Sequence, residues 1–323
     1  MRYGEVDVLK AIGIVAVVLI HSMRVRWDPG AADFEFTLKV ALRFGVPAFL
    51  ACSGFLYATT TPVVLATTVR RLRRILIPYL VASCAAQLFW FAWGIGRPAA
   101  TVVSDFLVAN SFGHYYYVFV IVQLVLLTPV FARLPFWTIA TLLVAFVGLQ
   151  VPTVTNFVGG NDLFWLMRYP PAWYAYFLLG WVVRLRYGAI RARVLRHRRA
   201  LVGWSSVSCI VLLVLGAMMT GPGPGSTARW LAVYPTLVLL FAIGCGRDHL
   251  PGAVRWLSET TYTVFLFHFF FVVIAMSWLR APPGVFSPAV IGGVCAAGFV
   301  GSFVLISIGR ALLGERVRDV LGA

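Results

Sequence analysis

The sequence predicts an all-α membrane protein, a polytopic bundle of about ten transmembrane helices with both chain ends in the cytoplasm. Hydrophobic residues make up 61% of the chain and charged residues 12%, and the mean hydropathy is +0.89. A soluble domain has too little interior to bury that much apolar surface. The apolar residues form runs long enough to cross a bilayer, and the arginines cluster in alternate segments between the runs. We therefore predict a single integral membrane domain over residues 1–323.

About ten apolar runs have the length that a bilayer demands, although the fifth and sixth are short. The longest connecting segments, 96–114 and 152–171, are too short for a separate soluble domain. No Walker or dinucleotide glycine motif is found, so any chemistry must use the helices and their loops. In chain order the runs cover residues 6–23, 36–58, 75–95, 115–131, 136–151, 172–183, 200–220, 230–245, 260–279 and 288–313.

The arginines set the orientation. With a cytoplasmic N-terminus, the inner segments collect Arg2, the 70–74 cluster, Arg133, the run 184–199, Arg247, Arg255, Arg310, Arg316 and Arg318. The outer segments hold only Arg24, Arg26, Arg97, Arg168, Arg229 and Arg280. This is the positive-inside pattern. We expect a multi-pass protein of the plasma membrane, which in an arginine-rich and lysine-poor chain suggests a bacterial inner membrane.

The positive-inside pattern also explains the net charge of +16. The basic residues lie in short clusters between apolar runs and not on an aromatic-interleaved surface, so the lipid bilayer and not nucleic acid is the predicted partner. The five cysteines lie inside apolar stretches without paired spacing. Neither a disulfide framework nor a metal site is indicated.

The first run carries three residues that seldom occur inside a transmembrane helix, namely Asp7, Lys10 and His21. Ionisable side chains in the bilayer are costly and usually serve a function. Lys10 and His21 are eleven positions apart, so they share one stripe of the helix and differ in depth by roughly 16 Å. Asp7 is spaced to pair with Lys10 across one turn. We expect the stripe to face protein, with His21 able to accept a proton from a hydroxyl; a histidine bonded to a neighbouring helix is the structural alternative.

Arginines mark two further candidates. Arg71 and Arg74, in RRLRRILIPY, are spaced to share a face, and guanidinium groups suit the phosphates of a nucleotide-bearing donor such as coenzyme A. Membrane orientation and lipid contact are the alternative. In the second run Arg43 lies near the depth of His21 and needs an anionic or carbonyl partner, either structural or an oxyanion of the reaction. Gly45 and Gly54 in the same run permit close backbone approach or a helix break.

Aromatic residues surround two more histidines. His114 is followed by three tyrosines, ending at Tyr117, at the outer start of the fourth run. Such a cluster either forms an interfacial belt or lines an acceptor site for a sugar. His268, within TYTVFLFHFFF, is more easily explained as a hydrogen-bonded core residue.

Five motifs in register resemble a known family over nearly the whole chain. They are the lysine and histidine of the first run with ten residues between them, VPAFLACSGF, the arginine pair with RILIPY, HYYYVFVIVQLVLLTPVF and SETTYTVFLFH. Together they resemble the acyltransferase 3 family of integral membrane acyltransferases. The resemblance implies His21 as the catalytic base, Lys10 as its motif partner, and Arg71 and Arg74 as contacts to acyl-CoA.

The resemblance also includes a histidine-aromatic pattern at residues 114–117 and a Ser-Tyr-His pattern at Ser258, Tyr262 and His268. The basic residue of the first motif is lysine here, which cannot form the bidentate fork of arginine. Some family members carry a C-terminal hydrolase-like domain, and we expect none here.

The expected reaction is O-acylation. Acyl-CoA, with acetyl as the expected acyl group, is a donor substrate from the cytoplasm, and no permanently bound cofactor or metal is expected. His21 deprotonates a hydroxyl of an extracytoplasmic or membrane-associated carbohydrate or glycosylated acceptor, which attacks the thioester; a covalent acyl-histidine is an alternative route. Arg43 is the candidate for oxyanion stabilisation.

Two other function classes use similar features. A transporter or flippase of an acyl or glycolipid substrate also places polar residues at mid-bilayer, but paired halves with repeated broken helices are not found. A scaffold would explain the arginine loops and leave the ionisable residues of the first run without a role. Acyl-CoA-dependent modification of an acceptor distinguishes the enzyme from both.

Overall fold

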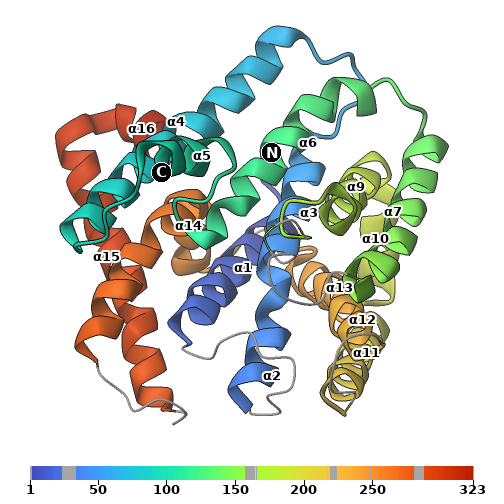
Figure 1. The fold of residues 1–323 in the computed structure, drawn as a ribbon. Helices are drawn as coiled ribbons and strands as arrows, with labels where there is room; N and C mark the ends of the chain where they lie inside the picture. The colour runs from blue at the N-terminus through green and yellow to red at the C-terminus, as the bar shows by residue number, and fades with distance from the viewer. Residues whose placement is uncertain are drawn as a thin grey trace. The chain divides into compact units, whose positions relative to one another are not determined.

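A computed structural model gives the fold (Figure 1). It describes residues 2–23, 34–156, 164, 166–218, 224–247, 249–279 and 287–322. All regular elements within these ranges are helices. Three outer-segment arginines of the topology prediction, Arg24, Arg26 and Arg280, lie outside the described residues.

Seven helices of the described chain are long and apolar enough to cross a membrane. Their bounds are Thr37–Tyr57, Leu65–Ala92, Gly113–Phe131, Arg198–Met218, Thr227–Gly244, Gly252–Trp278 and Pro288–Leu321. The other three predicted runs are also helical: α1 (Gly4–Ser22) holds Glu5, Asp7 and Lys10, α7 (Phe136–Asn156) is apolar over Phe136–Gln150, and α9 (Pro170–Leu185) has 16 residues. The all-helical membrane fold is thus confirmed, while the number of spans and the side of the termini stay predictions.

Two helices occupy segments that the sequence analysis treated as connections. α5 (Ala99–Leu107) lies within the predicted 96–114 loop, and α10 (Tyr187–Arg196) lies within the arginine run 184–199. The buried Val194 of α10 packs against Ala242 and Cys245, so an apolar contact holds this basic helix in place.

The chain forms two compact units, each assembled from two stretches: unit 1 from residues 1–62 and 130–258, and unit 2 from residues 63–129 and 259–323. Besides α1, α7, α9 and α10, unit 1 contains α2 (Phe34–Ala41), η1 (Leu42–Phe44), α3 (Gly45–Tyr57), α11 (Arg198–Met218), α12 (Pro224–Leu231) and α13 (Val233–Gly244). Unit 2 contains α4 (Leu65–Ala92), α5, η2 (Gly113–Tyr115), most of α6 (Tyr116–Phe131) and of α14 (Gly252–Trp278), α15 (Pro288–Leu313), η3 (Gly314–Arg316) and α16 (Val317–Leu321).

In unit 1, α3 packs on α9 through main-chain contact. A Cβ added to Gly54 of α3 would lie 1.9 Å from the carbonyl oxygen of Phe177 in α9. A Cβ added to Gly180 would lie 1.8 Å from the carbonyl oxygen of Ala51. Only small residues allow two helices to approach this closely. The predicted close approach at Gly54 is confirmed.

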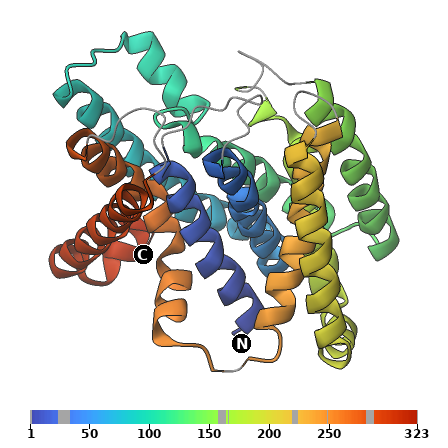
Figure 2. The same ribbon diagram turned by 90° about the horizontal axis from the view of Figure 1, so that it is seen from below.

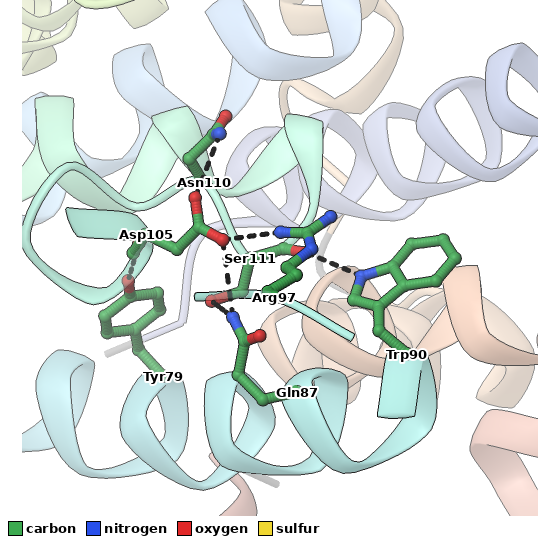
Figure 3. Close-up of polar contacts among 7 residues, drawn as sticks. All are labelled: Tyr79, Gln87, Trp90, Arg97, Asp105, Asn110 and Ser111. Atoms are coloured by element: carbon green, nitrogen blue, oxygen red, sulfur yellow. Dashed lines mark hydrogen bonds and ion pairs between the residues drawn. The ribbon is translucent and has the colours of Figure 1, made fainter. Parts of the chain in front are cut away.

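In unit 2, a polar cluster joins α4 to α5 and to the segment that follows it (Figure 3). The side chain of Asp105 is 5% exposed and forms an ion pair with Arg97 at 2.5 Å. Its carboxylate also accepts hydrogen bonds from Gln87 at 3.5 Å and Asn110 at 3.2 Å. The hydroxyl of Tyr79 donates to the carbonyl of Phe106 at 2.8 Å. One buried carboxylate therefore holds α5 against α4.

Replacement of Asp105 by alanine is expected to destabilise the protein by about 2–3 kcal/mol, because Arg97 and two amides lose a buried acceptor. Asp105→Asn keeps an acceptor oxygen and should cost less. Thermal unfolding in detergent measures both, and Asp319→Ala, at an exposed carboxylate of α16, serves as the control. An Asp105→Ala protein that melts with the wild type would contradict this role.

Candidate functional site

The stripe of α1 that carries Lys10 and His21 lies opposite the most exposed apolar side of this helix. Lys10 and His21 are both half-buried. Ile12 and Val15 are each 38% exposed. Around the helix axis these two residues lie about 200° and 140° from Lys10, whereas His21 lies only about 20° from it. The two polar residues therefore point away from the side of α1 that offers apolar surface, as the spacing predicts.

One local and one long-range contact hold the N-terminal end of α1. Asp7 is buried, and its Oδ2 pairs with Nε of Arg2 at 2.5 Å. Its Oδ1 accepts a hydrogen bond from Oγ of Ser258 at 2.5 Å. The spacing pointed to Lys10 as the partner of Asp7, whereas the structure gives Arg2 and Ser258 to the two carboxylate oxygens. Ser258, a member of the Ser-Tyr-His pattern, thus positions α1.

Glu5 is a second buried acid in the first turn of α1, and the sequence analysis missed it. It is 2% exposed. Tyr187, at the start of α10, is hydrogen-bonded to it; burial first, and then this hydrogen bond, raise the pKa of Tyr187. The phenol therefore stays protonated and donates a hydrogen bond to the carboxylate. The ring of Tyr3 stacks edge-on against those of Phe55 and Tyr187 at 4.9 and 5.2 Å, which adds an aromatic contact at the same end.

The middle of α1 packs against the start of α3 (Figures 1 and 2). A Cβ added to Gly45 would lie 2.8 Å from the carbonyl oxygen of Gly13 and 2.8 Å from Cγ2 of Val17. The second run is not broken here: the single 3₁₀ turn η1 joins α2 to α3 within the continuous helical stretch Thr37–Tyr57. The two glycines let the main chains meet at a level between Lys10 and His21.

The C-terminal end of α1 is held by a buried lysine that the sequence analysis also missed. Nζ of Lys39 donates to the carbonyl of Met23, the C-cap residue of α1, at 3.1 Å. Lys39 therefore lies at the level of Met23, and Gly45 at the level of Val17. Arg43, between Lys39 and Gly45 on the antiparallel segment, is placed along the part of α1 that holds His21. A cation four positions before Arg43 in an apolar run was the available signal.

Arg71 and Arg74 differ in exposure, although both belong to α4. Arg71 is half-buried, and its Nη1 donates to Oγ1 of Thr128 in α6 at 3.4 Å. Thr128 is fully buried and donates to the carbonyl of Val125 at 2.7 Å. Arg74 is exposed. α4 continues as a helix through Pro78. Of the predicted pair, Arg71 is the arginine that the protein fixes in position.

His114 and His268 meet in unit 2. Their ring centroids are 4.9 Å apart, and the two residues are 4% and 0% exposed. His114 Nε2 bonds to the carbonyl of Phe265 at 3.1 Å, and His268 Nδ1 bonds to the carbonyl of Val264 at 2.8 Å. A carbonyl only accepts, so these nitrogens carry the protons. His268 is therefore the hydrogen-bonded core histidine that the sequence analysis favoured.

The tyrosines after His114 are mostly buried as well. Tyr117 is 7% exposed, and its ring meets that of Phe265 edge-on with the centroids 5.1 Å apart. The hydroxyl of Tyr115 donates to the carbonyl of Leu266 at 2.8 Å. An interfacial belt would leave its rings accessible, so these residues belong to the core of unit 2 instead.

The predicted site residues thus fall into two groups, one in each unit. Lys10, His21 and Arg43 belong to unit 1, where α1 is held at both ends and in the middle. The members in unit 2 are Arg71, Arg74, His114 and Tyr117.

Comparison with known proteins gives a consistent result. The family model described as "Acyltransferase domain" matches residues 3–307. A curated protein of Bacillus subtilis (strain 168), named "Putative membrane-bound acyltransferase YfiQ", is 26% identical over 326 residues, which cover 92% of this chain and 90% of that protein. No solved structure matches the chain.

Proposed function

Because the chain belongs to the acyltransferase 3 family, and is thus a multi-pass membrane O-acyltransferase, we propose that it transfers an acetyl group from cytoplasmic acetyl-CoA to a hydroxyl of a carbohydrate or glycosylated acceptor. The acceptor is extracytoplasmic or associated with the membrane, and the enzyme lies in a bacterial plasma membrane. The acetyl donor, the acceptor class and the location are parts of this proposal.

In the proposed reaction His21 is the general base. Its imidazole takes the proton of the acceptor hydroxyl while the oxygen attacks the thioester carbonyl carbon. The tetrahedral intermediate then collapses, the carbon–sulfur bond breaks, and the coenzyme A thiolate leaves and recovers a proton from the imidazolium. The guanidinium of Arg43 is proposed to stabilise the oxyanion. Lys10, roughly 16 Å along the same stripe, is proposed to contact the donor nearer the cytoplasm.

The observation that best supports this proposal is that side-chain contacts hold α1 in place at both of its ends. A general base must be held within a fraction of an ångström of its working position. The buried Asp7 with Arg2 and Ser258 fixes one end of α1, and Lys39 on Met23 fixes the other. The half-buried stripe between these ends is where Lys10 and His21 lie.

Arg71 and Arg74 are expected to contribute unequally to the binding of acetyl-CoA. Arg71→Ala is expected to weaken acetyl-CoA binding about tenfold to hundredfold, because a positioned guanidinium that binds phosphate contributes about 1.5–3 kcal/mol. The exposed Arg74 should contribute much less, about twofold to fivefold on mutation to alanine. Equilibrium binding of labelled acetyl-CoA to the protein in nanodiscs measures both changes. Arg193→Ala, at an exposed arginine of α10, is the control, and equal losses at 71 and 74 would contradict this difference.

The reaction itself is tested in membrane vesicles. Label from the acetyl group of acetyl-CoA should enter envelope glycans or glycolipids only when the protein is present, and mass spectrometry of those fractions should show an added acetyl ester. Movement of an unmodified lipid or sugar across the vesicle without label transfer would favour the flippase and reject the enzyme mechanism.

A further inference from the structure

Thr68 is a polar residue close to Arg71 in the sequence, and no role has yet been assigned to it. Thr68 precedes Arg71 by three residues, so the two lie on one face of α4. Thr68 is 4% exposed, and its hydroxyl makes no hydrogen bond within the described part of the chain. A buried hydroxyl without a partner lowers stability, and native proteins seldom keep one without reason.

The usual local partner of such a hydroxyl is already engaged. A threonine inside a helix commonly donates to the carbonyl four residues before it, here that of Val64. That carbonyl accepts the backbone N–H groups of Thr67 and Thr68 at 2.9 and 3.3 Å. The hydroxyl of Thr68 is therefore left as a donor beside the arginine.

The surroundings of this hydroxyl favour an anion. The bond from Arg71 to Thr128 fixes the guanidinium group near α6. Thr68 is also in the first turn of α4, where the N-cap residue Val64 has no capping side chain and the helix dipole is positive. A hydroxyl, a guanidinium and a helix start make a set of donors that phosphate oxygens accept.

We propose that Thr68 and Arg71 bind the same phosphate group of the acyl-CoA donor, with the hydroxyl of Thr68 donating to one phosphate oxygen. This inference rests on the proposed function and adds to it a residue that the arginine motif does not contain. It predicts that Thr68 acts in binding and contributes nothing favourable to the fold of the free protein.

The test is equilibrium binding of labelled acetyl-CoA to the full chain in phosphatidylcholine nanodiscs, together with thermal unfolding. Thr68→Val removes the hydroxyl and keeps the shape of the side chain. It is expected to weaken binding about tenfold, since one hydrogen bond to a charged group is lost, with an unfolding temperature equal to or above that of the wild type. Thr68→Ser should restore most of the affinity.

The matched control is Thr67→Val on the same turn, whose hydroxyl lies 3.5 Å from Nη2 of Arg70. It should bind acetyl-CoA as the wild type does. Wild-type binding by Thr68→Val, or equal weakening by both variants, would overturn the role of Thr68. If Arg71→Ala also binds normally, the proposed donor site fails as a whole; if only Arg71→Ala is impaired, the donor site stands and Thr68 is excluded.

A lipid phosphate has the same chemistry, and two further measurements separate the sources. Acetyl-dephospho-CoA and acetyl-pantetheine lack one or more of the donor phosphates, and the Thr68→Val effect should disappear with the probe that lacks the bound phosphate. An effect that persists with acetyl-pantetheine would overturn the proposal. So would a Thr68→Val defect confined to thermal stabilisation by phosphatidylglycerol, because the bound phosphate would then belong to a lipid.

Discussion

His21→Ala is expected to lower the rate of acetyl transfer by about 10²- to 10⁴-fold, the contribution typical of a general acid–base group. Binding of acetyl-CoA should be unchanged, because the arginine proposed to hold the donor phosphates is on another helix. The rate is measured as label entering the acceptor fraction of membrane vesicles at saturating acetyl-CoA. A loss confined to the rate would indicate an interaction made in the transition state.

His197→Ala is the matched control, because His197 is an exposed histidine at the end of α10. It should transfer acetyl groups at the wild-type rate. Full activity in His21→Ala would reject the assignment of the base. Loss of both binding and folded protein in His21→Ala would instead assign this residue a structural role.

Gly54→Val is expected to prevent stable folding, with a larger loss of stability than a substitution on the surface would cause. A Cβ at this position would lie 1.9 Å from a main-chain oxygen of α9, and a main-chain atom cannot move aside as a side chain can. Overpacking usually costs about 1–3 kcal/mol, and we expect a loss at or above the top of that range. Size-exclusion chromatography in detergent should show little monodisperse protein, and the remainder should melt at a lower temperature.

Gly148→Val controls for the change of glycine to a β-branched residue inside a helix. Gly148 is exposed on α7, and a Cβ there would have nothing within 4 Å. This variant should elute and melt close to the wild type. If Gly54→Val behaves in the same way, α3 and α9 do not depend on main-chain contact.

Composition and run length were enough to predict an all-helical membrane fold, because bilayer thickness dictates the length of apolar runs. The same reasoning missed α5 and α10. α5 has an aspartate in its last turn, and Asp105 is tolerated there only because Arg97, Gln87 and Asn110 surround it. α10 is rich in arginine, and its helix is stabilised by a small apolar contact on one side. Both depend on tertiary partners, which a hydropathy pattern does not report.

For the candidate site too, relations within one helix could be predicted from the sequence, whereas contacts between distant segments could not. Helical periodicity correctly placed Lys10 and His21 on one stripe, because that relation is local to α1. The partners of Asp7 could not be found locally, since Ser258 is 251 residues away along the chain. Spacing also treated Arg71 and Arg74 as equivalent, whereas burial depends on the neighbouring α6 and separates them. Lys39 and Glu5 were missed because a single charge near a helix end resembles an ordinary flanking residue.

The bond between Asp7 and Ser258 also bears on biogenesis. The acid leaves the ribosome before its hydroxyl partner, which follows 251 residues later. At about 5–20 residues per second, roughly ten seconds to a minute passes before α1 can acquire that partner. Arg2, five positions from Asp7, is available throughout this interval. A nearby guanidinium can therefore neutralise the nascent segment until the final bundle forms around it.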